Sequence, residues 1–267
     1  MRLAFLGTPE MSVRPLRALV DAGHDVALVV TRPDARRGRG AALSPSPVKA
    51  AANELGLAVS HDVDDVLGVG AELGVVVAFG RIIKPHVLAR LRMVNLHISL
   101  QPRWRGAAPV ERALLAGDEV TGVCLMDVAE GLDEGDVFAR VDVPIGPRTT
   151  AAELREALVD AGTTLLVDEL RRGLGPPVPQ VGTPLYAAKI SAAELRIDWA
   201  RPASEIDRLI RVGGAWTTFR GSRLKVLAAD LDDGELRLVT VQPEGKPAMP
   251  FEAWRRGARL ADGEWFE

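Results

Sequence analysis

The chain has 267 residues, 47% of them apolar and 26% charged, with a formal net charge of −3. This length suits one large domain and a small one, and it is enough to bury a real core. The composition is that of an ordinary globular protein, and the net charge excludes a chain that coats nucleic acid over its whole surface. A local basic site stays possible, because the field near a loop depends on the charges in that loop.

Cysteine usage and the apolar runs bear on the compartment. Cys124 is the single cysteine, so an internal disulfide is excluded, as is usual in a reducing compartment. The first apolar stretch is short and is broken by Gly7 and Pro9. No stretch approaches the roughly 20 apolar residues of a membrane span. We therefore expect a cytoplasmic protein that does not enter the membrane.

The first half of the chain alternates short apolar runs with helical patterns. Leu16, Leu19 and Val20 recur at helical spacing, and Ser46 precedes Pro47 as the cap of another helix. Alternation of this kind predicts right-handed βαβ units and an α/β fold with a Rossmann-like, mostly parallel sheet. The predicted strands cover residues 3–6, 26–30, 75–79, 94–97 and 121–126.

The pattern changes near Thr150. Residues 150–172 predict a long amphipathic helix that begins with a Thr and Glu cap and ends at Gly173. The proline- and glycine-rich segment that follows cannot be a helix or a central strand, so it marks a domain end. We predict a catalytic domain over 1–183, a linker over 184–200 and a C-terminal domain over 201–267.

The sequence pattern of the C-terminal part predicts a small, mostly β domain. Residues 200–212 have a helical pattern, and strand-like runs follow at 216–219, 224–227 and 236–241. Asp232, Asp233 and Gly234 are typical of a turn between two strands.

The segment 95–106 holds the first candidates for chemistry. Asn95 and His97 lie two residues apart at the end of a predicted strand, so their side chains point to the same side. In open α/β sheets, ligands bind at the carboxyl ends of the strands. An imidazole can exchange a proton near neutral pH, and an amide can stabilise a developing oxyanion by about 3 kcal/mol.

A carboxylate to orient the imidazole is available in the acidic, glycine-flanked loop 130–136, which contains Asp133. Taken alone, these features are ambiguous. An Asn–His pair arises often by chance, a lone histidine is usually structural, and acidic glycine loops are mostly solvated turns.

The combined motif NLHxSL, PRWRGAAPVERAL and EGLDEGDV resembles the formyltransferase family that uses 10-formyltetrahydrofolate. The resemblance implies catalytic roles for Asn95, His97 and Asp133, and no metal. It also implies that a stretch of four residues contacts the folate: Ser99, Leu100, Gln101 and Pro102.

Other segments resemble the methionyl-tRNA formyltransferases within that family: FLGTPE, TRPD, PSPVK, YAAKIS and VTVQPEGKPAM. This resemblance implies transfer of a formyl group from 10-formyltetrahydrofolate to the α-amine of methionyl initiator tRNA. It also implies a monomer that ends in a small OB-like β-barrel. The segment 229–236 is shorter than is usual there, which leaves open whether the barrel is complete.

Two further features bear on the substrates. Residues 31–49 contain five basic side chains against one acid, and two glycines make the segment flexible. Basic side chains of this kind bind phosphate backbones, and the resemblance assigns them to tRNA: Arg36, Arg37, Arg39 and Lys49. Gln101 stands where the family usually has leucine, so it either weakens pterin packing or points to water.

Two alternative functions remain open. A sugar-nucleotide N-formyltransferase would share the catalytic residues without needing the basic segment. A weakly active paralogue would bind folate or tRNA with little turnover. A zinc site is not expected, because His24, His61 and His86 are scattered along the chain.

Overall fold

The computed structural model describes residues 1–37, 42–259 and 264–266. The chain divides into two compact units, each formed from more than one segment. Unit 1 comprises Met1–Gly106, Val120–Pro144 and Arg155–Tyr186, and unit 2 comprises Ala107–Glu119, Ile145–Leu154 and Ala187–Glu267.

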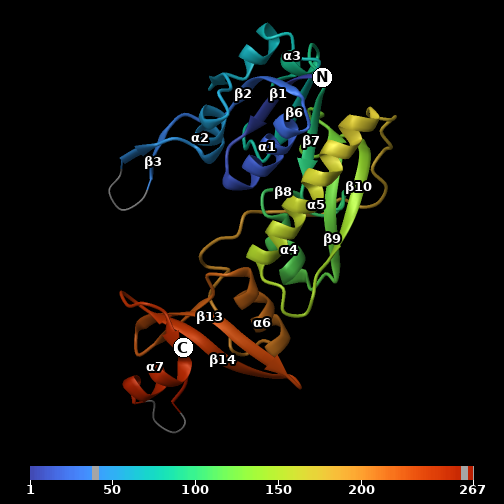
Figure 1. Ribbon diagram of the computed structural model, residues 1–267. Helices are drawn as coiled ribbons and strands as arrows, with labels where there is room; N and C mark the ends of the chain where they lie inside the picture. The colour runs from blue at the N-terminus through green and yellow to red at the C-terminus, as the bar shows by residue number, and fades with distance from the viewer. Residues whose placement is uncertain (38–41, 260–263, 267) are drawn as a thin grey trace. The chain divides into compact units, whose positions relative to one another are not determined.

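Unit 1 is built on a seven-stranded sheet in the order β10-β9-β7-β6-β1-β2-β5 (Figure 1). The five strands from β7 to β5 pair in parallel, whereas β9 is antiparallel to both β7 and β10. This confirms the mostly parallel α/β sheet. The strands are β1 (Arg2–Gly7), β2 (Asp25–Val30), β5 (Val59–Ser60), β6 (Leu73–Val77), β7 (Met93–His97), β9 (Val120–Asp127) and β10 (Val137–Pro144).

The central strands are apolar along their length because helices and loops cover both faces of the sheet. Leu6, Val30 and Val76 belong to one buried cluster, together with Phe79 and Met93. The strand β10 was not predicted. Its side chains are mostly half-buried or exposed, so it lacks the continuous apolar run of its neighbours.

Local signals set the helix ends of unit 1. The side chain of Ser46 accepts from the backbone N–H of Lys49 and so caps α2 (Pro47–Glu54), as predicted. Two 3-10 turns, η1 (Glu10–Ser12) and η2 (Asp64–Gly68), complete the connections. The other helices with residues in this unit are α1 (Val13–Asp21), α3 (Pro85–Leu88) and α5 (Ala151–Arg172).

The long helix α5 has the predicted capping box. The backbone N–H of Thr150 donates to Glu153, and the backbone N–H of Glu153 donates back to Oγ1 of Thr150. Gly173, at φ +80°, ends the helix. A Cβ added to Gly162 would lie 3.0 Å from Val123, so this glycine lets α5 lie close to β9 (Figure 1).

Two small β structures flank the main sheet. Within the basic segment, β3 (Ala35–Arg37) and β4 (Ala42–Ser44) pair as an antiparallel hairpin, which was not predicted. The two glycines on which the expected flexible loop depends, Gly38 and Gly40, lie outside the described residues. A buried hydrogen bond of 2.7 Å between Oγ1 of Thr31 and Oγ of Ser46 fixes its base. The short strands β8 (Arg105–Gly106) and β11 (Tyr186–Ala187) pair with each other.

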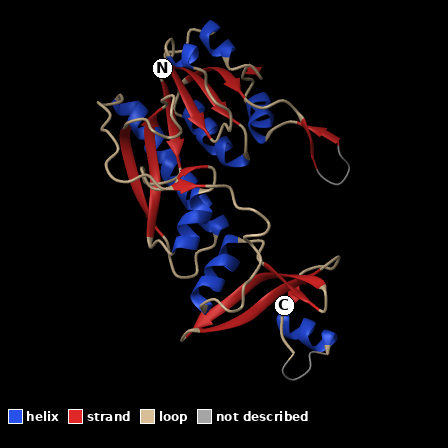
Figure 2. Ribbon diagram, turned by 180° about the vertical axis from the view of Figure 1, so that it is seen from behind, coloured by secondary structure: helices blue, strands red, loops and turns tan. Residues whose placement is uncertain are grey.

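Unit 2 contains a four-stranded antiparallel sheet with its own core. Its strands are β12 (Trp216–Phe219), β13 (Ser222–Asp232), β14 (Glu235–Pro243) and β15 (Met249–Pro250), in that order (Figure 2). The described residues thus supply four strands where an OB-like barrel has five. The helices are α4 (Pro109–Ala116), α6 (Ala203–Val212) and α7 (Phe251–Ala258), of which only α6 was predicted.

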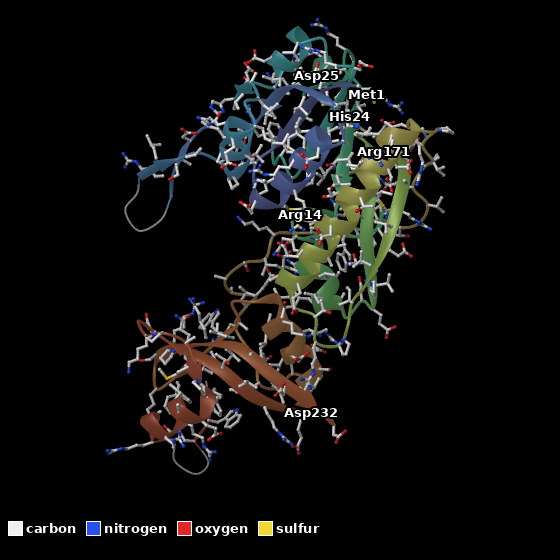
Figure 3. All side chains as sticks on the ribbon, in the orientation of Figure 1. Met1, Arg14, His24, Asp25, Arg171 and Asp232 are labelled. Atoms are coloured by element: carbon white, nitrogen blue, oxygen red, sulfur yellow. The ribbon has the colours of Figure 1, made fainter. Side chains whose placement is uncertain are left out.

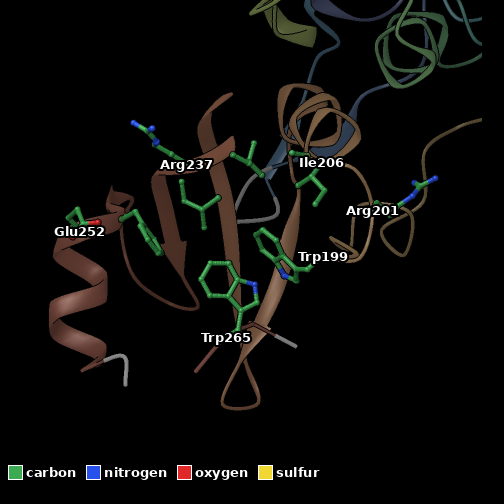
Figure 4. Close-up of a pocket in the computed structure, with 10 residues that line it drawn as sticks. Trp199, Arg201, Ile206, Arg237, Glu252 and Trp265 are labelled. Atoms are coloured by element: carbon green, nitrogen blue, oxygen red, sulfur yellow. The ribbon is translucent and has the colours of Figure 1, made fainter. Parts of the chain in front are cut away.

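The hairpin of β13 and β14 turns where the sequence predicted it. Asp233 and Gly234 both have positive φ, of +51° and +82°, as a two-residue type I′ turn requires. Beside this sheet lies a pocket lined by aromatic and charged residues, among them Trp199, Arg237 and Trp265 (Figure 4). None of the candidate catalytic residues lines it.

Candidate active site

The candidate site lies at the carboxyl end of β7. Asn95 and His97 are its third and fifth residues, and both pair in register with β9, opposite Met126 and Cys124. Asn95 is half-buried, and His97 is 8% exposed. The strand therefore holds the amide and the imidazole on one side of the sheet, as predicted.

The imidazole of His97 contacts the carboxylate of Asp133. Nε2 lies 3.0 Å from Oδ2, and the two side chains are 9% and 13% exposed. The same Oδ2 accepts from the backbone N–H of Gly106 at 2.8 Å. The carboxylate predicted from the acidic loop thus reaches the histidine 36 residues earlier in the chain.

Backbone requirements explain why this loop is rich in glycine. Asp133 itself has φ +52°, a left-handed conformation that Asp tolerates better than most residues. A Cβ on Gly135 would lie 1.9 Å from the backbone oxygen of Asp127. Only glycine allows the chain to fold back this closely, and the fold-back brings Asp133 to the ring.

Opposing effects act on the pKa of Asp133. Burial alone would raise it, because a carboxylate loses hydration. The hydrogen bond and charge of His97, the N–H of Gly106 and the charge of Arg105 outweigh burial, and the pKa lies below its ordinary value of 3.8. Asp133 is therefore ionised at neutral pH.

The second ring nitrogen of His97 also has partners. Nδ1 lies 3.1 Å from Oγ of Ser99 and 3.0 Å from Nε2 of Gln101. Ser99 is fully buried and Gln101 is 7% exposed, so the expectation that Gln101 points to water is wrong. The peptide bond between Gln101 and Pro102 is cis, and Leu100 is half-buried.

Two residues that the sequence did not single out hold the acidic loop. The amide nitrogen of Gln180 donates to the backbone oxygens of Asp133 and Gly135, at 2.9 and 2.8 Å. Arg105 donates to the amide oxygen of Gln180 and to the carboxylate of Glu134. The only sequence signal was indirect: a glutamine inside the proline-rich segment at the end of the first predicted domain.

Three of the four predicted tRNA-binding residues fall on or near the β3–β4 hairpin. Arg36 is exposed on β3, and Arg37 follows it on the same strand. Lys49 lies on α2, and its ammonium is paired with Asp34 at 2.7 Å. Arg39 lies outside the described residues.

The other histidines stand apart from this site, whereas the cysteine lies beside it, opposite His97 on β9. Burial lowers the pKa of His24, and the positive charges of the amino terminus and Arg171 lower it further (Figure 3). Cys124 is buried, and burial raises the pKa of its thiol. Within residues 1–37, 42–259 and 264–266, no three His, Cys, Asp or Glu side chains are grouped to hold a metal, and no helix could cross a bilayer.

The fold and the site are those of a group-transfer enzyme on a Rossmann-like sheet, and the comparisons define the class. A family model for formyl transferase matches residues 1–170, and one for the formyl transferase C-terminal domain matches residues 189–235. The chain belongs to the formyl transferase family.

Within that family, the similar curated proteins are methionyl-tRNA formyltransferases. The one from Roseobacter denitrificans is 42% identical over 100% of this chain and 99% of its own length. The one from Dinoroseobacter shibae is 48% identical over 88% of this chain and 84% of its own.

A solved structure shares the fold. The N-formyltransferase from Helicobacter canadensis, in complex with folinic acid and dTDP-3-aminofucose, aligns with a TM-score of 0.67. It is 16% identical, and the alignment covers 86% of this chain and 88% of that one.

Proposed function

We propose that this chain transfers a formyl group from 10-formyltetrahydrofolate to the α-amine of methionyl initiator tRNA. The observation that carries the proposal is the His97–Asp133 pair beside Asn95 at the end of β7. The geometry supports acyl transfer, because it combines a proton carrier with a possible oxyanion donor. Curated relatives named methionyl-tRNA formyltransferase, 42 and 48% identical, support the acceptor.

Each of the three catalytic residues has a distinct proposed role. The amide of Asn95 donates a hydrogen bond to the formyl oxygen as it gains negative charge. His97 adds positive charge there while it is protonated; it gives this proton to the departing folate nitrogen and, as the neutral ring, takes up the proton of the attacking amine. Asp133 orients the ring and neutralises its charge. The folate donor supplies the formyl carbon and leaves with a proton on its nitrogen.

The residues 99–102 fit a role beside the folate. They follow β7 directly, next to the ring of His97. Gln101 keeps a buried oxygen without a hydrogen-bond partner among the described residues, so this stretch has an acceptor to spare. We include Ser99, Leu100, Gln101 and Pro102 in the folate site on this basis and on the resemblance.

The tRNA site is assigned to the basic hairpin. Arg36 and Arg37 lie on β3, which can present basic side chains to a phosphate backbone. Arg39 is assigned to the same site on the resemblance. Lys49 contributes from α2 only if it exchanges Asp34 for a phosphate. Catalysis is assigned to residues 1–183, and a supporting role in tRNA binding to 201–267, joined by the linker 184–200. We place the protein in the cytoplasm as a monomer.

The test measures formyl transfer from 10-formyltetrahydrofolate to methionyl initiator tRNA, with methionyl elongator tRNA as the matched acceptor control. We expect transfer to the initiator and at least a tenfold lower kcat/KM for the elongator, a difference of about 1.4 kcal/mol. Transfer to an amino-sugar nucleotide instead of tRNA would replace this proposal with the sugar-nucleotide alternative. Folate binding without transfer to either acceptor would identify a weakly active paralogue.

A further inference from the structure

The side chain of Gln101 completes a hydrogen-bonded triangle with His97 and Ser99. Its Nε2 lies 3.0 Å from Nδ1 of His97 and 3.1 Å from Oγ of Ser99, and the ring nitrogen and the hydroxyl are 3.1 Å apart. All three side chains are at least nine-tenths buried. A leucine, which the family usually has at this position, could neither donate nor accept here.

The number of hydrogens on each group determines which atoms donate and which accept within the triangle. Oγ of Ser99 has one hydrogen, which it donates to the backbone oxygen of Trp104 at 3.3 Å. It therefore accepts one of the two amide hydrogens of Gln101, and Nδ1 of His97 accepts the other. A nitrogen that accepts carries no proton, so the hydrogen of the neutral ring is on Nε2, which donates it to Asp133.

The same amide leaves one buried atom unused. Oε1 of Gln101 has no hydrogen-bond partner among the described residues. When His97 gains a second proton, Nδ1 becomes a donor and would face the N–H of Gln101. A half-turn of the amide about its terminal torsion, which is soft in glutamine, brings Oε1 to Nδ1. The unused oxygen then accepts the new hydrogen.

We propose that Gln101 is a positioning residue that follows the protonation of His97. Its amide nitrogen holds the neutral ring as the Nε2–H tautomer, and its oxygen accepts from Nδ1 when the ring is protonated. The ring keeps its orientation toward Asp133 in both states. The catalytic meaning of this contact rests on the proposed function, whereas the contact itself can be tested without turnover.

The substitutions at Gln101 leave the other ionisable groups around the ring of His97 in place. Asp133 faces Nε2 from the loop after β9, and Arg105 on β8 adds positive charge near that carboxylate. Cys124 on β9 pairs with His97 in register, and its Sγ accepts from the backbone N–H of Gln101. Burial raises the pKa of this thiol, so it remains neutral.

The experiment follows the ring nitrogens of His97 by NMR on the full chain with ¹⁵N-labelled histidine. Spectra of wild type, Gln101→Leu and Gln101→Glu are recorded across pH, and the signals are assigned with His97→Gln. The wild type should show an unprotonated Nδ1 and a protonated Nε2 when the ring is neutral. The opposite tautomer would overturn the proposal, even if no variant folds.

The two substitutions should move the titration midpoint of the ring in opposite directions. In Gln101→Leu the protonated ring loses its acceptor and gains an apolar neighbour, so the midpoint should fall by about one pH unit. In Gln101→Glu a carboxylate faces Nδ1–H, so the midpoint should rise by about one pH unit. Unchanged midpoints, or shifts in the same direction, would overturn the proposal.

Gln242→Leu is the matched control, since this glutamine lies in unit 2 and its exposed side-chain amide donates to the backbone oxygen of Lys246. It should leave the midpoint of His97 unchanged, and near-UV circular dichroism establishes that each variant is folded. In formyl-transfer assays, the acid limb of the pH–rate profile should follow the NMR midpoints. NMR shifts without any transfer by the wild type would reject the proposed function and leave this inference standing.

Discussion

At the scale of single residues, the contact between His97 and Asp133 is the most specific feature of the site. Both side chains are nearly closed off from water, and each partner satisfies the other. Asn can replace Asp at the positive φ of position 133 without strain. Asp133→Asn therefore removes the charge while it keeps the shape of the loop.

We expect Asp133→Asn to lower kcat for formyl transfer by about 10²- to 10⁴-fold, the usual contribution of a positioned acid or base. The dissociation constant for tRNA should stay within a factor of two, roughly the noise of such measurements. Asp136→Asn, the same change in the same loop, is the control and should keep most of the activity. A variant at Asp133 with near-normal kcat would remove this residue from the mechanism.

The lowered pKa of Asp133 also sets a pH dependence of stability. The carboxylate binds a proton less readily in the folded chain than in the unfolded one, where its pKa is 3.8. Its contribution is therefore complete above 3.8 and is lost as the pH falls through the lower folded value. Urea titrations should show the wild type losing its advantage over Asp133→Asn in that window. A constant difference between pH 3 and pH 6 would contradict the assignment.

Gln180 offers a second test at this scale, because it holds the loop without touching the ring of His97. Gln180→Leu leaves the backbone oxygens of Asp133 and Gly135 without their donor, which should cost about 1–3 kcal/mol of unfolding free energy. Displacement of Asp133 should lower kcat by about tenfold or more. Urea titration and initial-rate assays measure the two effects, with Gln242→Leu as the control. An unchanged kcat would show that the loop keeps its shape without this brace.

Some of these site residues could be predicted from the sequence, and others could not. Asn95, His97 and Asp133 stand in a dense motif, and strand periodicity places the first two on one side. Gln180 lies 47 residues from the loop that it holds, and no local pattern marks it. The contact of Gln101 with His97 depends on the turn after β7, which the sequence does not specify. Long-range contacts and turn geometry are set by tertiary packing.

At the scale of elements, the sequence predicted best where the signal is local. The caps of α2 and α5 and the turn between β13 and β14 need only neighbouring residues, and all three occur as predicted. The half-exposed strand β10 was missed because its pairing with β9 supplies the structure that its own pattern does not indicate. The strands β3 and β4 of the basic segment were not predicted, because each is only three residues long and no apolar period marks them.

At this scale, the β3–β4 hairpin can be tested for its role in tRNA binding. Arg39→Ala should weaken binding of initiator tRNA and reduce the slope of log K against log salt by about 0.7 to 0.9, the loss of one phosphate contact. Filter binding between 50 and 200 mM salt measures this slope. Arg90→Ala, an exposed arginine outside the hairpin, is the control and should keep the wild-type slope. If Arg39→Ala keeps it as well, the hairpin is not the phosphate-binding element.

At the scale of the whole molecule, the net charge of the chain is opposite in sign to the charge of the proposed tRNA-binding segment. The chain has a net charge of −3, yet the proposed partner is a polyanion. Long-range attraction over the whole surface cannot drive such a complex, so local basic segments must do so. We therefore expect few phosphate contacts. The slope of log K for tRNA binding against log salt should be shallower than that of a strongly basic tRNA-binding protein.

The two compact units also have separate hydrophobic cores. Val30 belongs to a cluster within unit 1, and Val226 to a cluster within unit 2; both side chains are fully buried. Four of the five tryptophans lie in unit 2, and only Trp104 lies in unit 1. Tryptophan fluorescence therefore reports mainly the unfolding of unit 2, whereas far-UV circular dichroism reports both units.

The same substitution in each core should separate the two transitions. Val226→Ala and Val30→Ala each replace a buried isopropyl side chain with a methyl group, which should lower the free energy of unfolding by about 2 kcal/mol. In urea, Val226→Ala should lower the midpoint detected by fluorescence. Val30→Ala should leave that midpoint in place and shift only the part of the circular dichroism signal that unit 1 contributes. Equal shifts of both signals in both variants would mean that the chain unfolds as one cooperative body, because a loss in either core would then destabilise every residue alike.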